Sequence, residues 1–377
     1  MHQTATTSDR GTTMALAPIP LIRTPEDISD AWLTKVFRAS GDLDDTQSVI
    51  FSEKVSLGDA AGLLGVLYRV HPQYSDGAEG PTSVVIKFPT PDPTQRATAD
   101  VLGFYKREVT FYNEHAHDLP FGVPHCYGAV QDTESTDFVL VMEDVAYLDQ
   151  IDQVAGATLD QARTAVAQIA AFHAKWWESQ TLDAMGEIYL PLLNPVYLVA
   201  LPQIFEGGWG PAVEHEGHNI TPEVKAFGDA WGSHVEFMLS ALSTPRTIAH
   251  GDFRGDNLLF DEDNNLTILD FQIMGVGNGL FDVAYFMCQT VDTDVRHGHD
   301  DELIQLYVDT LAANGVEYSF DDAKTAYRIA AAFCLIYAVT SFAAYDAFEG
   351  RQHQLMSKML SRSVRTIVDN DALALIP

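Results

Sequence analysis

Two carboxylates and one amide form the most informative polar group in this sequence. Asp252 is followed five residues later by Asn257, and after an apolar trio and a turn the chain returns to Asp270. Apolar residues on both sides of the turn predict a short hairpin whose ends bring the three side chains together. This set suits phosphoryl transfer, in which one Asp orients or deprotonates a hydroxyl while an Asn and a second Asp hold Mg²⁺.

The elements that must position this hairpin fall into two sets. Stretches rich in β-branched residues predict strands at 48–57, 65–74, 82–89, 125–130 and 137–144, with one helix over about 98–115. Apolar residues at helical spacing predict helices at 159–179, 223–242, 299–314, 321–346 and 351–369. A further helix is expected to open at Thr24-Pro25, because these residues suit the first positions of a helix.

The order of these elements predicts an α+β fold in two lobes. Residues 21–147 form an N-lobe with an antiparallel sheet and one main helix, and residues 148–377 form a mostly helical C-lobe that carries the catalytic hairpin. Residues 1–20 are expected to be a disordered N-terminus. The segment 181–222 contains five prolines, which predict loops with short helices at most.

The composition limits the partners and the cell compartment. A formal net charge of −31 argues against nucleic acid, whose backbone is bound by Lys and Arg. A negative field can steer cationic substrates, although a well-solvated surface explains the same charge. Three widely spaced cysteines are typical of a reduced, cytoplasmic protein. The uncharged run 329–345 is shorter than the roughly 20 residues that span a membrane, so it predicts a buried core helix.

The motif HGDFRGDN, followed by ILDFQ, resembles the catalytic loop and metal-binding triplet of the protein-kinase-like fold. More specifically, it is similar to the aminoglycoside phosphotransferase and choline kinase superfamily. The DFQ variant, with VGNGLFDVAYF after it, is most similar to the ecdysteroid-kinase-like branch and its bacterial relatives. The resemblance implies Asp252 as catalytic base, and Asn257 and Asp270 as Mg²⁺ ligands. It also implies structural support from His250 and Asp282.

The same resemblance implies a nucleotide site in the N-lobe. Lys87 in SVVIKF matches the lysine that anchors the phosphates of ATP, and Glu108 matches the carboxylate that holds this lysine. Further contacts with ATP are implied for a glycine-containing loop and for the stretch that joins the lobes: Gly58, Gly62, Met142, Glu143 and Val145. Arg254 is a candidate contact to phosphate or acceptor, and His173 is expected to be structural.

These features together predict an ATP- and Mg²⁺-dependent kinase that phosphorylates a hydroxyl of a small molecule. Only eleven residues separate Asp270 from Asp282, too few for the activation segment of a protein kinase. A bulky apolar alcohol is favoured as acceptor by the DFQ-type resemblance and by aromatic residues in 181–240. A cationic acceptor of the aminoglycoside or choline type stays open, as does a catalytically silent pseudokinase or scaffold. The oligomeric state stays undetermined.

Overall fold

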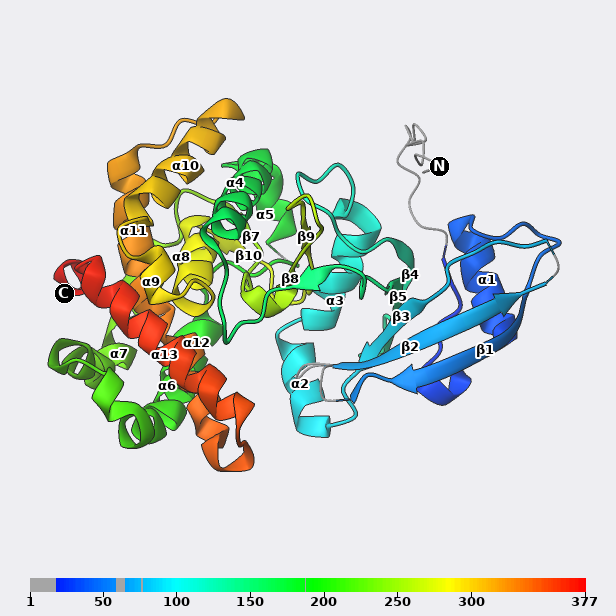
Figure 1. The fold of residues 1–377 in the computed structure, drawn as a ribbon, viewed down its shortest axis with the longest axis horizontal. Coiled ribbons are helices and arrows are strands. Elements are labelled where there is room, and N and C mark those ends of the chain that lie inside the picture. The colour runs from blue at the N-terminus through cyan, green and yellow to red at the C-terminus, as the bar shows by residue number, and fades with distance from the viewer. Residues whose placement is uncertain (1–17, 59–64, 76, 187) are drawn as a thin grey trace. The chain divides into compact units, whose positions relative to one another are not determined.

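The computed structural model describes residues 18–58, 65–75, 77–186 and 188–377 (Figure 1). The chain divides into two units. The first takes the N-terminal part up to Asp118 together with His125–Asp144, and the second takes Leu119–Pro124 together with Val145–Pro377. The α+β class with an N-terminal antiparallel sheet, predicted from the sequence, is confirmed.

The first unit is built on one five-stranded sheet, in which every neighbouring pair is antiparallel and the strand order is β1-β2-β3-β5-β4. Its strands are β1 (Val49–Ser56), β2 (Gly65–Tyr74), β3 (Val84–Pro89), β4 (Cys126–Gln131) and β5 (Phe138–Glu143). Its helices are α1 (Asp30–Ser40), α2 (Pro93–Val101) and α3 (Phe104–Thr110), with a 3-10 turn at Pro25–Asp27 and a π-helical turn at Phe111–His115.

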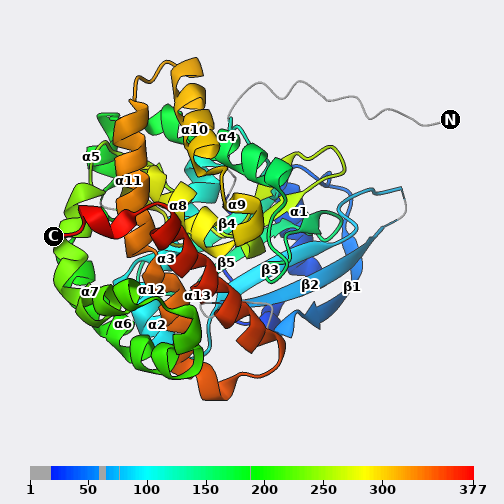
Figure 2. The same cartoon turned by 60° about the vertical axis from the view of Figure 1, so that its left-hand side comes forward.

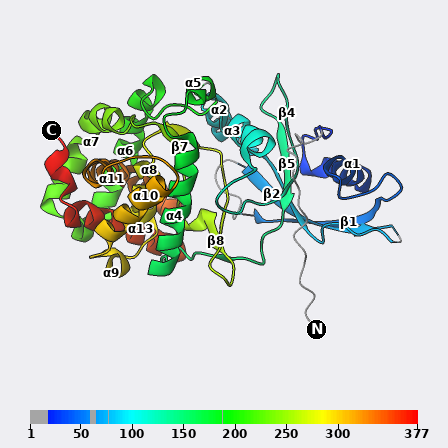
Figure 3. The same cartoon turned by 90° about the horizontal axis from the view of Figure 1, so that it is seen from above.

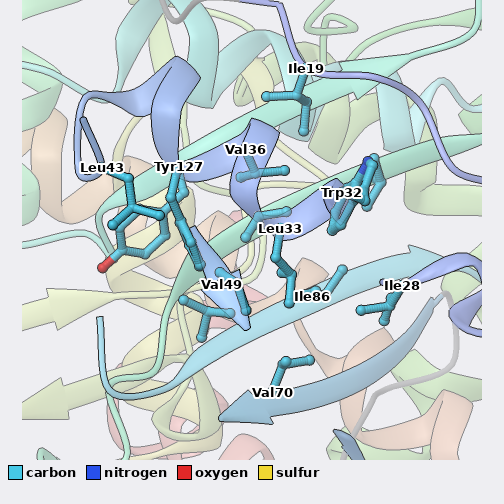
Figure 4. Packing of buried hydrophobic residues seen from close by; sticks show 14 of the residues in the cluster. Ile19, Ile28, Trp32, Leu33, Val36, Leu43, Val49, Val70, Ile86 and Tyr127 are labelled. Atoms are coloured by element: carbon cyan, nitrogen blue, oxygen red, sulfur yellow. The ribbon is translucent and has the colours of Figure 1, made fainter. Parts of the chain in front are cut away.

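Helix α1 covers one face of this sheet and closes the core of the unit (Figure 4). Leu33 and Val36 on α1 and Ile86 on β3 are fully buried in this cluster. Ile19 lies within the stretch expected to be disordered, yet it is buried in the same cluster. The helix begins later than expected, because Ser29 accepts a hydrogen bond from the amide of Trp32 and so provides the N-terminal cap.

The helix predicted over 98–115 is interrupted. Helix α2 ends at Val101, and α3 begins at Phe104 after Gly103. Gly103 has a φ of +69°, a left-handed conformation that glycine adopts without a side-chain clash. Glu108 therefore lies on a short second helix rather than on one long helix.

The second unit is mostly helical, with small sheets of short strands. Its strands are β6 (Asp149–Gln150), β7 (Thr247–Ala249), β8 (Leu258–Phe260), β9 (Leu266–Ile268) and β10 (Gly275–Gly277). Its helices are α4 (Leu159–Trp176), α5 (Thr181–Met185), α6 (Pro195–Glu216), α7 (Pro222–Ala241), α8 (Leu280–Gln289), α9 (Thr293–Arg296), α10 (Asp300–Ala313), α11 (Phe320–Phe333), α12 (Leu335–Ser341) and α13 (Arg351–Asp369). Short 3-10 turns lie at Gly217–Asn219, Gly255–Asn257, Phe342–Ala347 and Ala372–Leu375.

Helix α8, whose residues are all buried, packs against α4, α11 and α13 (Figures 2 and 3). Among the described residues, one helical run, Phe320–Ala347, is long and apolar enough to cross a membrane, and 61% of its most apolar window is buried in the protein. Burial of this kind is the pattern of a core helix, as the sequence predicted.

The prediction of short helices at most in 181–222 is wrong. Helix α6 runs for 22 residues and contains Pro202 and Pro211. Tertiary packing offsets the lost backbone hydrogen bonds of the prolines. Phe205 stacks on Trp231 of α7 with ring centroids 4.4 Å apart, and a Cβ added at Gly208 would lie 2.1 Å from the carbonyl oxygen of Val339. Phe205 and Trp209 of α6 and Phe227 and Trp231 of α7 thus form core, whereas Phe237 is exposed.

Candidate active site

The hairpin predicted from the sequence is present in the second unit. Strands β8 and β9 pair antiparallel, and the amide of Leu269 donates to the carbonyl oxygen of Asn257 at 2.9 Å. Asn257 directly precedes β8, and Leu269 follows β9 and directly precedes Asp270. The bond therefore pairs Asn257 with the neighbour of Asp270. Asp270 itself has a φ of +62°, which is unusual for a residue other than glycine.

The carboxylate of Asp252 receives hydrogen bonds on both oxygens. Its Oδ1 accepts from the Tyr285 hydroxyl at 2.8 Å and from Arg254 Nε at 3.0 Å, and its Oδ2 accepts from Asn257 Nδ2 at 2.9 Å. Burial raises the pKa of Asp252, but the Arg254 charge and these hydrogen bonds outweigh burial, so the pKa lies below its ordinary value. Asp252 is therefore ionised at neutral pH and has the form that a base or an orienting group needs.

The amide of Asn257 is oriented by its own hydrogen bonds. Nδ2 donates to the carbonyl oxygen of Asp252 as well as to its carboxylate, at 2.9 Å each. The side-chain oxygen of Asn257 is thereby directed away from Asp252. Amide and carboxylate oxygens are hard donors of the kind that Mg²⁺ prefers, so this oxygen and the Asp270 carboxylate stay predicted ligands. Among the described residues there is no group of three His, Cys, Asp or Glu that could hold a metal.

A buried carboxylate braces the loop that precedes Asp252. Asp282 on α8 accepts from the amides of His250 at 2.6 Å and Gly251 at 2.9 Å. Its Oδ2 also lies 3.1 Å from His173 Nε2, and both side chains are fully buried. Gly251 has a φ of +87°, and a Cβ there would lie 2.2 Å from the carbonyl oxygen of Ile273, so only glycine fits.

His250 links this loop to the second half of the hairpin. Its Nε2 lies 3.0 Å from the carbonyl oxygen of Leu269, and its Nδ1 accepts from the amide of Asp252 at 3.2 Å. The ring also contacts Phe271 edge to face, with centroids 4.9 Å apart. Because a carbonyl can only accept, Nε2 carries the proton. His250 therefore supports the loop through both ring nitrogens.

In the first unit, Lys87 and Glu108 form a buried ion pair. Lys87 Nζ lies 2.9 Å from both carboxylate oxygens of Glu108, and the two residues are 6% and 1% exposed. Strand β3 holds the lysine between Leu67 of β2 and Leu140 of β5. Burying two charges is costly, so a pair of this kind fixes the position of the ammonium group more than it stabilises the fold.

Four of the five other residues implied for nucleotide binding lie in the described part of the chain. Gly62 lies outside the described residues. Gly58 has a φ of +58° and donates its amide to Ser56 Oγ at 3.2 Å. Within the first unit, Met142 and Glu143 end strand β5, and the Glu143 amide donates to the His125 carbonyl oxygen at 2.8 Å.

Val145 belongs to the second unit, and its carbonyl oxygen accepts from the amide of Leu148 at 3.0 Å. The Glu143 amide and the Val145 carbonyl are therefore both hydrogen-bonded within the chain.

Two residues without a predicted role contact the loop that carries Asp252. Tyr285 follows Asp282 by three positions on α8, so both side chains lie on one helix face and reach the same loop. That spacing is a signal that could have revealed Tyr285. Gln153 could not be found in this way: its Oε1 accepts from Arg254 Nη1 and from the amide of Asp256 at 3.3 Å each, across about a hundred residues.

Three pockets, of about 440, 470 and 330 Å³, lie away from the predicted site, and none of the three is lined by a residue predicted for catalysis or nucleotide binding. The first belongs to the first unit, near Tyr105 and Asp132, and the other two belong to the second unit.

Comparison with known proteins gives a family and a fold. A sequence profile of the ecdysteroid kinase-like family matches residues 60–176 and 213–317, more than half of the chain. No curated protein sequence matches the chain.

Among solved structures, a choline kinase from Cryptosporidium parvum Iowa II aligns with a TM-score of 0.54 and 12% identity, covering 90% of this chain and 95% of that one. A macrolide 2'-phosphotransferase from Brachybacterium faecium aligns with a TM-score of 0.47 and 15% identity, covering 89% of this chain and 98% of that one. The choline kinase alignment confirms the kinase-like fold.

Proposed function

Because the chain belongs to the ecdysteroid kinase-like family, and is thus a small-molecule phosphotransferase of kinase-like fold, we propose that it transfers the terminal phosphoryl group of ATP to a hydroxyl of a small molecule. A new bond forms between the acceptor oxygen and the γ-phosphorus, and the bond from that phosphorus to the β,γ-bridging oxygen breaks. ADP leaves, and the hydroxyl proton is released. The favoured acceptor is a bulky apolar alcohol.

One observation carries this proposal: Asn257 Nδ2 lies 2.9 Å from Asp252 Oδ2, and the Asn257 backbone is paired with Leu269. The ionised carboxylate of Asp252 is thereby joined to the Asn257 amide, whose oxygen points away from it. Leu269, which pairs with Asn257, is followed directly by Asp270. Phosphoryl transfer needs this combination of an orienting base and oxygen ligands, and little covalent chemistry from the protein.

In this proposal Asp252 accepts a hydrogen bond from the acceptor hydroxyl, orients its oxygen for in-line attack and takes its proton. Asn257 and Asp270 hold Mg²⁺, which neutralises charge on the phosphate oxygens. In the first unit, Lys87, held by Glu108, binds phosphate oxygens of ATP. Gly58, Gly62, Met142, Glu143 and Val145 stay proposed contacts of the nucleotide.

The preference for an apolar acceptor rests on the DFQ-type resemblance. Tyr285, which donates to Asp252, stacks on Tyr337 with ring centroids 4.1 Å apart and an interplanar angle of 16°. Both rings also contact Phe281. Tyr285 and Phe281 are buried, and so are Phe205 and Trp231 of α6 and α7, so neither aromatic group by itself selects an acceptor.

The net charge of −31 supports a second candidate, a cationic acceptor such as an aminoglycoside or a choline-like alcohol. Aromatic rings can bind such cations as well as apolar groups. The two candidates therefore differ in the charge of the acceptor and share the phosphoryl donor and the reaction.

The test is ADP release from ATP–Mg²⁺ in the presence of sterol-like alcohols, macrolides, aminoglycosides and choline analogues. Turnover confined to the uncharged alcohols supports the favoured acceptor, and turnover confined to the cations supports the second candidate. A thermal shift with ATP–Mg²⁺ but no transfer to any acceptor or to water would favour a pseudokinase. Lys87→Met, which removes the proposed phosphate contact, serves as the inactive control.

A further inference from the structure

Tyr285 contacts the carboxylate of Asp252 from a different element of the fold. The tyrosine is 4% exposed on α8, whereas Asp252 lies in the loop after β7. Its hydroxyl donates to Oδ1 at 2.8 Å, and its ring is fixed by stacking on Tyr337 of α12. Helix α8 also holds the preceding loop through Asp282. One rigid helix thus reaches both the backbone and the side chain of the proposed catalytic loop.

The two oxygens of Asp252 are not equivalent. Among the described residues, Oδ1 accepts from Tyr285 and from Arg254, whereas Oδ2 accepts from Asn257 alone. Each carboxylate oxygen accepts about two hydrogen bonds, so both sites on Oδ1 are filled and one site remains on Oδ2. A hydroxyl that approaches the carboxylate therefore finds its acceptor site on Oδ2.

The remaining donors cannot fix this orientation without Tyr285. Arg254 divides its guanidinium among Asp252, Asp256 and Gln153, and its side chain is 28% exposed. Asn257 holds only Oδ2, about which the carboxylate can still turn. The Tyr285 hydroxyl comes from a buried ring with a stacked partner, so its direction is set by packing.

We infer that Tyr285 is a positioning residue, which occupies Oδ1 of Asp252 and so presents Oδ2 to the acceptor hydroxyl. This inference rests on the proposed role of Asp252 as the base. Tyr285 itself takes no proton and touches no phosphate. Loss of its hydroxyl lowers the rate of transfer because the carboxylate spends less time in the reactive orientation, and binding of ATP is unchanged.

The experiment compares Tyr285→Phe with the wild type, using release of labelled phosphate from ATP–Mg²⁺ to water as the reaction. Phenylalanine keeps the stacked ring and removes one hydroxyl. We expect kcat to fall roughly 10- to 100-fold, as for a hydrogen bond to a charged group, while KM for ATP stays within about twofold.

Tyr327→Phe provides the matched control. Tyr327 is fully buried in the same unit and donates to another carboxylate, Asp300 Oδ1, at 2.7 Å. We expect Tyr327→Phe to lower the unfolding midpoint about as much as Tyr285→Phe does and to leave kcat unchanged. A loss of activity equal to that of Tyr285→Phe would assign both effects to general destabilisation and overturn the inference.

The double variant Asp252→Asn with Tyr285→Phe tests whether the tyrosine acts through Asp252. We expect Tyr285→Phe to change the residual rate of Asp252→Asn by less than about twofold, because there is no base left to orient. A full additional loss in that background would overturn the inference, as would wild-type kcat in Tyr285→Phe. A wild type that transfers phosphate from ATP–Mg²⁺ neither to water nor to any of the acceptors, or an Asp252→Asn variant as fast as wild type, would instead refute the proposed function, and the inference with it.

Discussion

In two regions of the second unit, an aspartate accepts hydrogen bonds from one tyrosine, one arginine and one asparagine. Asp252 accepts from Tyr285, Arg254 and Asn257, and its arginine also pairs with Asp256. Asp300 accepts from Tyr327 at 2.7 Å, Asn370 at 3.2 Å and Arg296 at 2.5 Å, and its arginine also pairs with Asp369. Residue types alone do not distinguish the two, although Arg254 contacts Oδ1 of Asp252 and Arg296 contacts Oδ2 of Asp300.

The regions differ in exposure and in what lies next to the carboxylate. Arg296 is fully buried, whereas the side chains of Arg254 and Asp252 are 28% and 17% exposed. The Asp252 region also continues into a hairpin that leads to Asp270, a second oxygen donor. The Asp300 region, although it borders a pocket, joins α9, α10, α11 and the end of α13. A buried donor set of this kind therefore serves stability, and the same set at an accessible hairpin end can serve chemistry.

The largest expected effect separates the two aspartates directly. Asp252→Asn should lower phosphoryl transfer by about 10²- to 10⁴-fold, the range expected for loss of a general base, with ATP binding retained. Asp300→Asn should keep its rate and lose thermal stability, because Arg296 stays buried with one carboxylate fewer. Steady-state kinetics and thermal unfolding of both variants check this. Similar losses of activity in both would erase the functional distinction between the regions.

Substitution of the two arginines should affect the free energy of unfolding, with the larger loss in the Asp300 region. Arg296→Met leaves Asp300 and Asp369 without their shared buried cation, which should cost about 3–5 kcal/mol of unfolding free energy. Arg254→Met should cost less than about 2 kcal/mol, since the partly exposed carboxylates around it can be hydrated. Urea denaturation measures both values. Equal losses would mean that exposure does not separate the two regions.

The two asparagines provide a finer test. Asn257→Ala removes a proposed Mg²⁺ ligand, so the Mg²⁺ concentration for half-maximal activity should rise at least about 10- to 100-fold, the loss that is typical even for residues that only support a metal ligand. Asn370→Ala removes the bond to Asp300 and should leave the Mg²⁺ dependence unchanged. Titration of activity with Mg²⁺ at saturating ATP checks both. An unchanged Mg²⁺ requirement in Asn257→Ala would remove this residue from the metal site.

The smallest effect concerns Asp292, a partly exposed aspartate that pairs with Lys358 and Arg362 of α13. Burial raises the pKa of Asp292, but the two cations outweigh burial, so the pKa lies below its ordinary value of about 3.9. The stability from this lowered pKa is therefore present above about pH 4 and is lost as the pH falls through the folded value.

Asp292→Asn should accordingly lower the unfolding midpoint slightly at pH 7, and the difference from wild type should shrink towards pH 3. Thermal scans across this range measure it. A constant difference would show that the side chain acts by packing rather than by charge.

Sequence reasoning located the strands of the first unit and most helices of the second, because burial of one face imposes a period on the apolar residues. It failed where tertiary packing outweighed local preference. Pro202 and Pro211 predicted a break, yet α6 continues through both because Phe205 and Gly208 pack closely against neighbouring helices. Gly103, in contrast, interrupts a predicted helix through its own left-handed conformation.

For the site, the sequence by itself determined that the proposed residues lie on one short hairpin and its preceding loop, while the resemblance supplied their proposed roles. Asp252 and Asn257 are five residues apart and hydrogen-bonded, and the hairpin pairs Asn257 with Leu269, the residue before Asp270. Only the tertiary structure decided that Tyr285 reaches Oδ1 of Asp252 and that Asp300 gathers a similar donor set in the core. Such contacts join residues that are tens of positions apart, and their geometry depends on how whole helices pack.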